Sequence, residues 1–408
     1  MRLVYGRSPW VDRFPKSRVP AFPSYKGDSD IDVAIIGGGL TGCATAYAFA
    51  AAGVRVSLFE AGRIGQGSSA ASGGWITEEP PARFADVDKA LGRRSARHAW
   101  NAWRRAALDF TALIRRLDLK CHLETRSGLL VAHTPEQAAQ LAREQKLRSE
   151  AGVESTVVPA RSIGAIAGFP AAAALRSRDN ATLDPLRATL GLAAAAKKRG
   201  ARIFEKSEVT KTSFTRDSAT VSVGSGVVRA RRIIVATGTP AASFKPLARH
   251  FDPRTAFLVL TEPVPAKLRK SLGSRDHLLR DAADPPHRIA WLDDERLLVA
   301  GADGGRVVAG RLRDAALVQR TGQLMYELST FYPEISGLQP AYGWDAPYST
   351  TSHGLPIIGP HRNYPHHLFA LGGDGSQSVT GAYLASRILL RHHQDDPQAA
   401  DLAFGFAL

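Results

Sequence analysis

The chain has 408 residues, more than one hydrophobic core usually serves, and its 44% hydrophobic and 22% charged content is typical of a soluble globular enzyme. No apolar run approaches the ~18 residues that a membrane-spanning helix needs. The two cysteines, Cys43 and Cys121, match neither a disulfide framework nor a metal site. We therefore expect a metal-free enzyme of the reducing cytoplasm. The net charge of +15 would suit a nucleic acid, a membrane surface or an acidic substrate. Lys and Arg are spread along the chain, however, which favours a solvated basic surface over a nucleic-acid partner.

Residues 1–29 are expected to form an extended arm on the protein surface, because prolines interrupt them repeatedly. They contain no apolar stretch of the kind that defines a secretory signal, so we expect no such signal here. The sequence indicates no role for this arm.

The stretch from Asp32 to Glu60 predicts a dinucleotide-binding unit of strand, glycine turn, helix and strand. The turn has the pattern G-x-G-x-x-G: Gly37 permits a sharp turn, Gly39 lets the backbone approach a pyrophosphate, and Gly42 lets the helix pack closely on the strand. The helix N-terminus would point N–H groups at the phosphates. Glu60, at the tip of the second strand, would accept the hydrogen bonds of an adenosine ribose, which favours FAD or NAD over NADP.

Residues 61–76 are rich in Gly, Ser and Ala, which are too small to build a core but allow a backbone to pass close to a bulky, flat ligand. A flexible loop would have the same composition. Directly after a ribose-binding carboxylate, however, the loop indicates a cofactor longer than NAD that continues toward a flavin ring.

Residues 93–119 predict one amphipathic helix, because its apolar residues from Trp100 to Leu117 recur at spacings of three and four, with arginines on the opposite face. A helix on a membrane surface would show this pattern, but we favour a helix that packs its tryptophan side on the protein. A strand at 128–132 and a charged helix at 135–151 follow. All three elements are expected in a second, cap-like domain.

The chain then returns to the first domain, with an alanine-rich helix at 186–198, a strand at 201–209 and a hairpin over 220–229. A closing strand and small-residue turn at 233–238 would bring backbone beside the adenosine side of the dinucleotide.

Between residues 253 and 310, short strands alternate with Pro, Gly and Asp turns and predict an antiparallel sheet, the floor of a substrate domain. A helix at 315–331 follows. The last segment again has a strand, at 368–371, that enters a glycine-rich turn and a helix starting near Ser378. The dipole of such a helix can stabilise negative charge on a reduced flavin ring.

Seven segments, taken together, carry a family resemblance. They are GGGLTG (37–42), Glu60, GQGSSAASGG (65–74), GARIFEKSEV (200–209), IIVATG (233–238), TSHGLPIIG (351–359) and GGDGSQSVTG (372–381). In these segments, which occur in family order, the chain resembles the D-amino-acid oxidase-like superfamily of FAD-dependent oxidoreductases. That group includes glycine oxidases, sarcosine oxidases and γ-glutamylputrescine oxidoreductases.

The resemblance implies an α/β fold with two noncontiguous domains. One would be a Rossmann-like FAD-binding domain of the glutathione-reductase type, built from residues 30–80, 178–245 and 340–408. The other would be an α+β substrate domain on an antiparallel sheet, built from residues 81–177 and 246–339.

The resemblance also implies the path of FAD, with the backbone of Val209 at the adenine and residues 375–377 at the pyrimidine edge of the flavin. Relatives that hold the flavin covalently have a Cys where our alignment places Ala346, so we predict noncovalent FAD. The residues predicted to bind FAD are Gly37, Gly39, Leu40, Thr41, Gly42, Glu60, Ala61, Arg63, Gly67, Ser68, Ser69, Ser72, Gly73, Gly74, Val209, Thr237, Gly238, Gly373, Asp374, Gly375, Ser376 and Gln377.

The implied reaction removes a hydride from the carbon beside the nitrogen of an amine or amino acid, delivers it to flavin N5 and leaves an imine that hydrolyses; dioxygen or an electron-transfer acceptor would reoxidise the flavin. Tyr348 and Trp75 are predicted walls of the substrate cavity, Gln377 and His353 polar groups near the ring, and Arg288 a ligand for an acidic group. His353 stands where the family often has Asp, and a structural loop histidine fits equally. Gln377 stands where sarcosine-type relatives have Lys, which favours an amine over an amino acid.

Three other functions stay open. A dehydrogenase of 2-hydroxy acids or polyol phosphates would have the same fold and use an active-site histidine as its base. A tRNA-modifying flavoenzyme would account for the net charge of +15. A flavoprotein without catalysis would serve as a subunit or scaffold.

Overall fold

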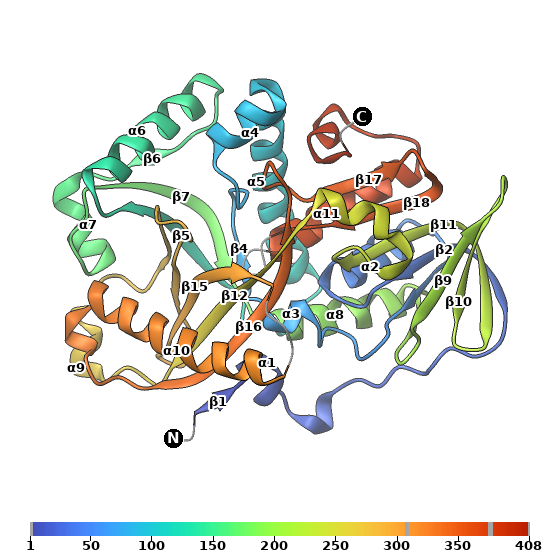
Figure 1. The fold of residues 1–408 in the computed structure, drawn as a ribbon, viewed down its shortest axis with the longest axis horizontal. Helices are drawn as coiled ribbons and strands as arrows, with labels where there is room; N and C mark the ends of the chain where they lie inside the picture. The colour runs from blue at the N-terminus through green and yellow to red at the C-terminus, as the bar shows by residue number, and fades with distance from the viewer. Residues whose placement is uncertain (1–2, 307–309, 374–377, 407–408) are drawn as a thin grey trace.

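The computed structural model describes residues 3–306, 310–373 and 378–406, and its strands form two sheets, one on each side of the molecule in Figure 1. The eight-stranded sheet consists of β2 (Ser29–Ile36), β3 (Val56–Phe59), β8 (Arg202–Phe204), β9 (Val209–Phe214), β10 (Ala219–Val223), β11 (Gly226–Gly238), β17 (Ile357–His361) and β18 (Tyr364–Leu371). The ten-stranded sheet consists of β1 (Val4–Tyr5), β4 (Trp75–Ile76), β5 (Glu124–Ala132), β6 (Thr156–Val157), β7 (Ala173–Thr182), β12 (Asp252–Thr261), β13 (His277–Asp281), β14 (Arg288–Trp291), β15 (Leu297–Gly305) and β16 (Pro340–Thr350).

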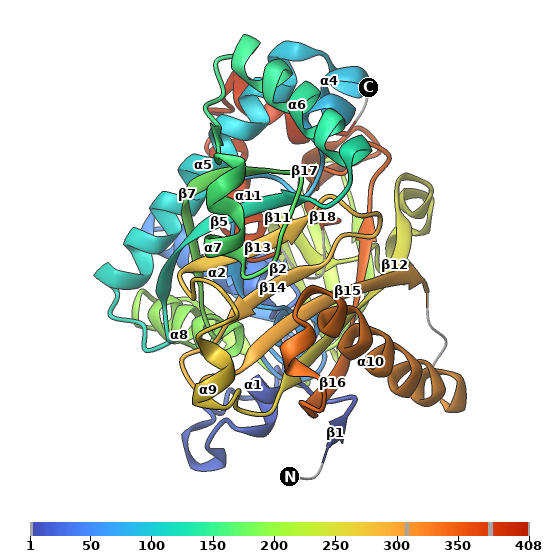
Figure 2. The same ribbon diagram turned by 90° about the vertical axis from the view of Figure 1, so that its left-hand side faces the viewer.

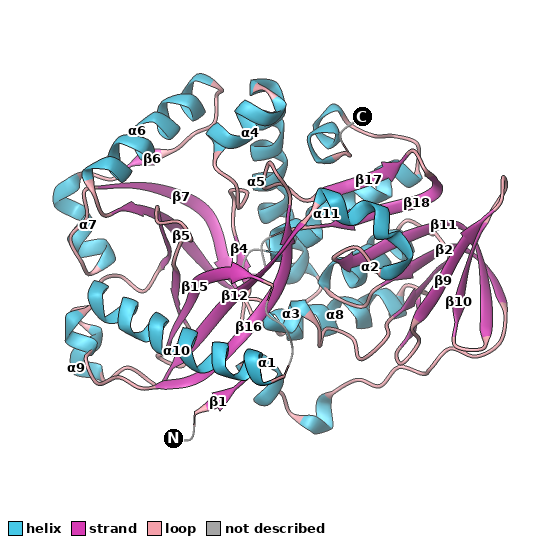
Figure 3. Ribbon diagram, in the orientation of Figure 1, coloured by secondary structure: helices cyan, strands magenta, loops and turns pink. Residues whose placement is uncertain are grey.

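Helices surround these sheets (Figure 3). The α-helices are α1 (Pro9–Asp12), α2 (Leu40–Ala51), α3 (Ser68–Ala71), α4 (Phe84–Leu91), α5 (Arg93–Arg116), α6 (Pro135–Glu150), α7 (Ala160–Ala167), α8 (Pro185–Lys198), α9 (Ala266–Arg269), α10 (Arg311–Phe331) and α11 (Ser378–His393). The described residues also form the 3₁₀-helices η1 (Lys16–Arg18), η2 (Ala242–His250), η3 (Pro333–Ile335) and η4 (Ala399–Phe404). This mixed α/β architecture confirms the predicted fold class.

The eight-stranded sheet is parallel at its centre, where the strand order is β18-β11-β2-β3-β8. The residues Val33 to Ile36 of β2 are all buried, because both faces of the sheet are covered. Val33 and Ile35 pack in the cluster that contains α2, α8 and α11, whereas Ala34 and Ile36 pack with the side chains of β10 and η2. The alanines of α2 let this helix lie between α8 and α11 on the sheet.

The ten-stranded sheet has two different faces. Helix α10 packs on one of them, against β12, β15 and β16, and buries Leu317, Leu324 and Leu328 there (Figure 2). The opposite face contains Leu258 and Trp344, which pack in one cluster with Trp75 and Ala71 from the glycine-rich loop after β3. Because of this packing, the second face of the sheet lies toward the predicted cofactor loop.

The amphipathic helix α5 packs its tryptophan side on the protein, as we favoured. Trp100, Trp103, Phe110 and Ile114 are buried against neighbouring elements that include α4 and α11, so they are not available to a membrane surface. Among the described residues, no helix is long and apolar enough to cross a membrane.

The structure departs from the predicted elements in two places. The strand expected at 201–209 ends at Phe204, because Lys206 adopts a left-handed conformation (φ 49°) and the chain turns toward the loop that follows β3. There the Glu205 carboxylate accepts a hydrogen bond from Ile64 N at 2.8 Å, and Ser207 N donates to Glu60 O at 2.8 Å. The arm at 1–29 is also not simply extended, since it contains β1, α1 and η1.

The division of the chain into two domains stays a prediction. Residues 340–350, which we assigned to the FAD-binding domain, form β16 and pair with β12 in the ten-stranded sheet. Trp75 and Ile76 form β4, which pairs with β7 in that same sheet. The two predicted domains are therefore joined by strands as well as by loops.

Candidate active site

The glycine turn after β2 has the tight geometry that a dinucleotide site requires. Gly37 adopts a φ of +107°, which favours glycine, and a Cβ on Gly42 would lie 1.9 Å from the carbonyl oxygen of Gly37. Gly38 is equally constrained, because its Cβ would meet Ile64 Cδ1 at 2.4 Å and Glu60 Cβ at 2.8 Å. Helix α2 begins at Leu40, and the first turn of a helix offers N–H groups that have no partner within the helix.

The Glu60 carboxylate closes this turn. One oxygen accepts a hydrogen bond from Gly38 N at 2.7 Å, and the other accepts one from Gly62 N at 2.7 Å. Glu60 is half-buried, and each carboxylate oxygen has a further lone pair for a ribose hydroxyl. Val209, predicted at the adenine, begins β9 two residues after Ser207, whose N–H binds the Glu60 carbonyl.

Hydroxyl groups hold the loop at 61–76 against this turn. Ser69 is buried, and its Oγ accepts a hydrogen bond from Leu40 N at 2.8 Å, which ties the loop to the start of α2. Ser72 is also buried, and its Oγ accepts one from Gly74 N at 3.0 Å. Arg63 and Ser68 are exposed. The loop thus has a fixed backbone with only some of its polar groups facing outward.

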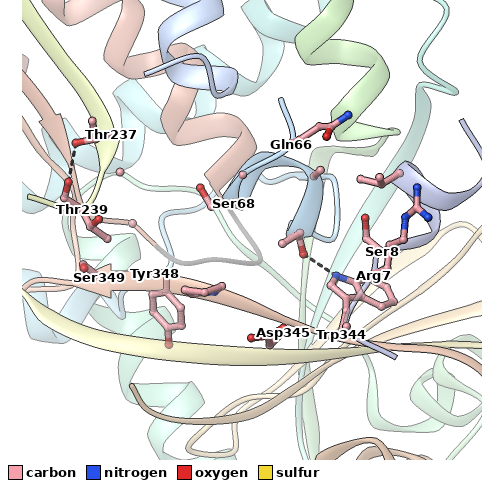
Figure 4. Close-up of a pocket in the computed structure, with 18 of the residues that line it drawn as sticks. Arg7, Ser8, Gln66, Ser68, Thr237, Thr239, Trp344, Asp345, Tyr348 and Ser349 are labelled. Atoms are coloured by element: carbon pink, nitrogen blue, oxygen red, sulfur yellow. Dashed lines mark hydrogen bonds between the residues drawn. The ribbon is translucent and has the colours of Figure 1, made fainter. Parts of the chain in front are cut away.

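A cavity of about 540 Å³ lies beside this loop. Figure 4 shows Gln66 and Ser68 on one side of it, Trp344, Asp345 and Tyr348 of β16 on the other. Its lining comes from the segments 6–8, 66–71, 237–239, 344–349 and 372–373, with Val11 and Arg313. The cavity therefore brings together the predicted residues Gly67, Ser68, Thr237, Gly238, Gly373 and Tyr348.

Glycines leave room along this lining for a flat ligand. A Cβ on Gly67 or Gly373 would meet no atom within 4 Å, and one on Gly238 would come no closer than 3.9 Å, to Ser68 Oγ. The two glycine loops are joined, because Gly372 N donates a hydrogen bond to Gly238 O at 2.8 Å. This open, backbone-lined cradle fits a tricyclic ring better than a side-chain core would.

Ion pairs and hydrogen bonds fix the side chains of β16 at the cavity. The Tyr348 hydroxyl donates to Asp303 Oδ2 at 2.6 Å, and Trp344 Nε1 donates to Ala71 O at 2.9 Å. Arg313 contacts both carboxylate oxygens of Asp345, at 2.9 and 2.6 Å, and this bond raises the pKa of the guanidinium. These bonds hold the Tyr348 side chain at the cavity, and its role as a wall of the substrate site stays a prediction.

Three other predicted side chains lie elsewhere. Trp75 is fully buried in the cluster that contains Leu258 and Trp344 and does not line the cavity. His353 Nδ1 accepts a hydrogen bond from Leu355 N at 3.2 Å within its own turn, and burial lowers the pKa of its imidazole, as for a structural loop histidine. Arg288 is buried on β14, opposite Ala300 of β15, and does not line the cavity either. Their roles in binding stay predictions.

Four predicted residues, Asp374, Gly375, Ser376 and Gln377, lie outside the described part of the chain. The cavity also has lining residues that sequence reasoning missed, among them Arg7, Ser8, Arg313 and Asp345. No motif marks them, because they reach the cavity through strand pairing and helix packing between distant segments.

Comparisons with known proteins agree with this geometry. A sequence model of the FAD dependent oxidoreductase family matches residues 32–391. The chain belongs to this family. It is therefore an FAD-dependent oxidoreductase, as predicted, and residues 3–31 precede the matched region.

The chain is also similar to proteins that are named as enzymes. The chain is 28% identical over 375 residues to γ-glutamylputrescine oxidoreductase of Escherichia coli, an alignment that covers 91% of this chain and 85% of that protein. It is 24% identical over 365 residues to glycine oxidase of Bacillus licheniformis, covering 88% and 93%. Its fold is similar to those of glycine oxidase from Geobacillus kaustophilus (TM-score 0.73, 21% identity, covering 93% and 98%) and L-proline dehydrogenase from P. horikoshii (TM-score 0.74, 16% identity, covering 93% and 96%).

Proposed function

We propose that this FAD-dependent oxidoreductase oxidises the C–N bond of a small amine or amino acid to an imine, which water then hydrolyses. The observation that carries this proposal is the cavity, in which Tyr348 of the large sheet faces the glycine-rich loops predicted to hold the flavin. Two relatives, γ-glutamylputrescine oxidoreductase and glycine oxidase, are named for substrates that contain an amine nitrogen, which supports a nitrogen-bearing substrate here.

In this proposal, FAD would lie along the described residues in a defined order. The turn at 37–42 would receive the pyrophosphate, Glu60 the ribose, and the cradle of Gly67, Gly238 and Gly373 the flavin ring. In this arrangement Gly238 lies at the flavin and not at the adenosine side that the sequence led us to expect. When bound, FAD supplies the hydride acceptor. The chain would position the substrate with Tyr348, exclude water with the buried loop at 69–76, and stabilise negative charge with the N-terminus of α11, which begins at Ser378.

We infer that FAD is held noncovalently. The position where covalent relatives have Cys is the buried Ala346, and neither Cys43 nor Cys121 lines the cavity. Burial raises the pKa of both thiols, that of Cys121 to about 12, so neither thiol is a nucleophile at neutral pH. Both thiols are free, which suits the reducing cytoplasm that we propose as the location. Acid precipitation should leave the flavin in the supernatant, and yellow pelleted protein would contradict noncovalent binding.

The test of the reaction is anaerobic reduction of the flavin, read as loss of its visible absorption. We expect bleaching by one or more amines or amino acids and none by 2-hydroxy acids or glycerol phosphate. The alternative hydroxy-acid reaction was expected to use an active-site histidine as its base, and the described residues that line the cavity include no histidine. Bleaching by hydroxy acids alone would overturn the proposal. Admitting dioxygen afterwards would show whether dioxygen or a separate acceptor reoxidises the flavin.

A further inference from the structure

The arm at residues 3–28 precedes the region matched by the family but builds one end of the cavity. Gly6, Arg7, Ser8 and Val11 are among the lining residues. Figure 4 shows Arg7 and Ser8 at one end of the cavity and Thr237 at the other. Whatever this end binds therefore contacts side chains that the family-matched region does not supply.

Several bonds hold the arm in this place. Strand β1 pairs in parallel with β16, with Val4 opposite Tyr342, and Gly6 N donates to Gly343 O at 2.8 Å. Trp10 Nε1 donates to the carbonyl of Ser72 at 2.9 Å, so α1 is tied directly to the predicted cofactor loop. These bonds tie the arm both to the ten-stranded sheet and to the loop at 61–76, which indicates a structural wall rather than a loose tail.

Further contacts fix the segment just after the cavity. The Tyr342 hydroxyl donates to Asp12 Oδ2 at 3.0 Å, and Arg13 forms an ion pair with Asp294 at 2.6 Å. The guanidinium of Arg13 also stacks on the Tyr342 ring, 5.2 Å from its centroid. The backbone that carries Arg7 and Ser8 is therefore anchored on either side of them.

Ser8 has a buried hydroxyl that the protein leaves without a partner. The residue is 5% exposed, and its Oγ makes no hydrogen bond to any described residue. Ser8 occupies the N-cap position of α1, where a serine hydroxyl usually accepts a backbone N–H, but this bond is not made. A buried hydroxyl without a partner costs free energy, so its place in the cavity lining points to a polar group of a ligand.

Arg7 supplies positive charge beside this hydroxyl. Its ion pair with Asp12 is a contact at 3.3 Å, and half of its side chain is exposed. The other arginine among the described lining residues, Arg313, is held by both oxygens of Asp345. A guanidinium has five N–H donors, so Arg7 retains donors for a second carboxylate.

We propose that Arg7 and Ser8 form a subsite for a carboxylate that the amine substrate carries away from the C–N bond that is oxidised. This inference rests on the proposed amine oxidation. The guanidinium would pair with the carboxylate, and the Ser8 hydroxyl would donate to one of its oxygens. The preferred substrates would then be primary amines with a terminal acid, and the arm would be the element that selects them.

The test compares two amines of equal length, 5-aminopentanoate and pentylamine, in anaerobic flavin reduction. The parent enzyme should prefer 5-aminopentanoate in kcat/KM. Loss of a charge-assisted hydrogen bond typically lowers affinity by a factor of about ten to one hundred, so Arg7→Gln should reduce this preference by about that factor. Ser8→Ala, which removes a neutral donor, should reduce the preference by about three- to tenfold. The matched controls are Arg18→Gln and Ser17→Ala, exposed residues of the same arm that do not line the cavity.

A second measurement does not depend on amine oxidation. Pentanoate has the carboxylate but no nitrogen, and its binding can be followed as a change in the flavin absorption spectrum. The parent should bind it more tightly than Arg7→Gln does, even if no amine proves to be a substrate. An unchanged preference and unchanged pentanoate binding in both variants would overturn the subsite. Loss of flavin from Arg7→Gln would also overturn it, by assigning the arginine to the cofactor.

Discussion

The unit β2–α2–β3 and the cavity beside β16 build their sites from different kinds of atoms. In the first, residues 29–60 form a continuous segment and the functional groups are backbone N–H groups and one carboxylate. In the second, side chains of the arm meet those of β16 and α10, although Gly6 and Arg313 are 307 positions apart in the chain. We therefore expect the first site to lose its function when a substitution adds side-chain atoms to a glycine, and the second when a substitution removes a side-chain group.

This difference has a physical basis. A backbone cradle needs space, so its critical residues are glycines, and a Cβ on Gly37 or Gly42 would collide with a neighbouring backbone carbonyl. A side-chain site needs specific donors and charges at fixed positions, so the surrounding sheet and ion pairs must hold them. Substitutions in the β2–α2–β3 unit should therefore change stability and FAD content, whereas substitutions in the cavity should change turnover.

The largest effect is expected for Gly42→Ala. The new Cβ would lie 1.9 Å from the Gly37 carbonyl oxygen, so either the helix or the turn must move, and we expect a loss of at least about 3 kcal/mol in the free energy of unfolding together with loss of FAD. Chemical denaturation and flavin absorbance measure both. The control is Gly322→Ala in α10, where a Cβ meets no atom within 4 Å and higher helix propensity should stabilise by about 0.5–1 kcal/mol. Equal effects of the two substitutions would contradict this account.

The next effect is expected for Glu60→Gln. The amide retains one carbonyl oxygen but loses the charge and an acceptor, so the contacts to Gly38 N and Gly62 N cannot both be kept as they are. We expect the Kd for FAD to rise about ten- to hundredfold while the protein remains folded. Titration of the apoprotein with FAD, followed by flavin fluorescence, gives this number. Glu208→Gln, an exposed carboxylate in the same region, should bind FAD as the parent does.

The same difference explains which features the sequence predicts. The glycine turn is recognisable because its spacing is local: strand, turn, helix and Glu60 follow one another within about thirty residues. The pairing of β1 with β16 joins Val4 to Tyr342, and no pattern in a two-residue strand specifies such a partner. The cavity role of the arm was therefore not predictable, although Tyr348 was expected there.

The strand expected at 201–209 shows that local sequence can fail to predict structure even within a single segment. Its apolar residues end at Phe204, and the chain then turns at Lys206 to donate hydrogen bonds to the loop after β3. At this turn, hydrogen bonds to a distant segment outweigh the local preference for an extended chain. At His353, in contrast, a local contact is enough to explain the side chain. Its Nδ1 accepts a hydrogen bond from Leu355 N within the same turn, so no ligand is needed to explain that nitrogen.

In the cavity, Tyr348→Phe should act on turnover and not on folding. The substitution removes the hydroxyl that donates to Asp303 and keeps the ring in place. We expect flavin content and thermal stability close to those of the parent, and a decrease of about tenfold in kcat/KM, as for one hydrogen bond lost during substrate positioning. Stopped-flow bleaching with a reactive amine measures it. The exposed Tyr326→Phe on α10 is the control, and equal kinetics of all three proteins would remove Tyr348 from the site.

The smallest effect on the site is expected from a charge cluster whose residues do not line the cavity. His287 lies between Asp281, at 2.7 Å from its Nδ1, and Glu327, at 2.9 Å from its Nε2. Burial alone would lower its pKa, but the hydrogen bonds and charges of these two carboxylates outweigh burial and raise the pKa to about 9 from the ordinary 6.5. The imidazolium therefore stabilises the folded protein at neutral pH.

This raised pKa determines the sign of the pH dependence. The stabilisation is fully present below pH 6.5, where folded and unfolded chains both carry the proton, and it is lost as the pH rises through about 9. We expect a decrease on the order of 2 kcal/mol in the free energy of unfolding across this window, which His287→Gln should abolish. Glu327→Gln should move the loss to lower pH, because one of the two carboxylates is gone. Urea denaturation at pH 6, 7.5 and 9 measures these changes in stability, and parallel pH profiles for the parent and His287→Gln would contradict them. Neither His287 nor its two partners line the cavity. The kcat of both variants at pH 7 should therefore equal that of the parent.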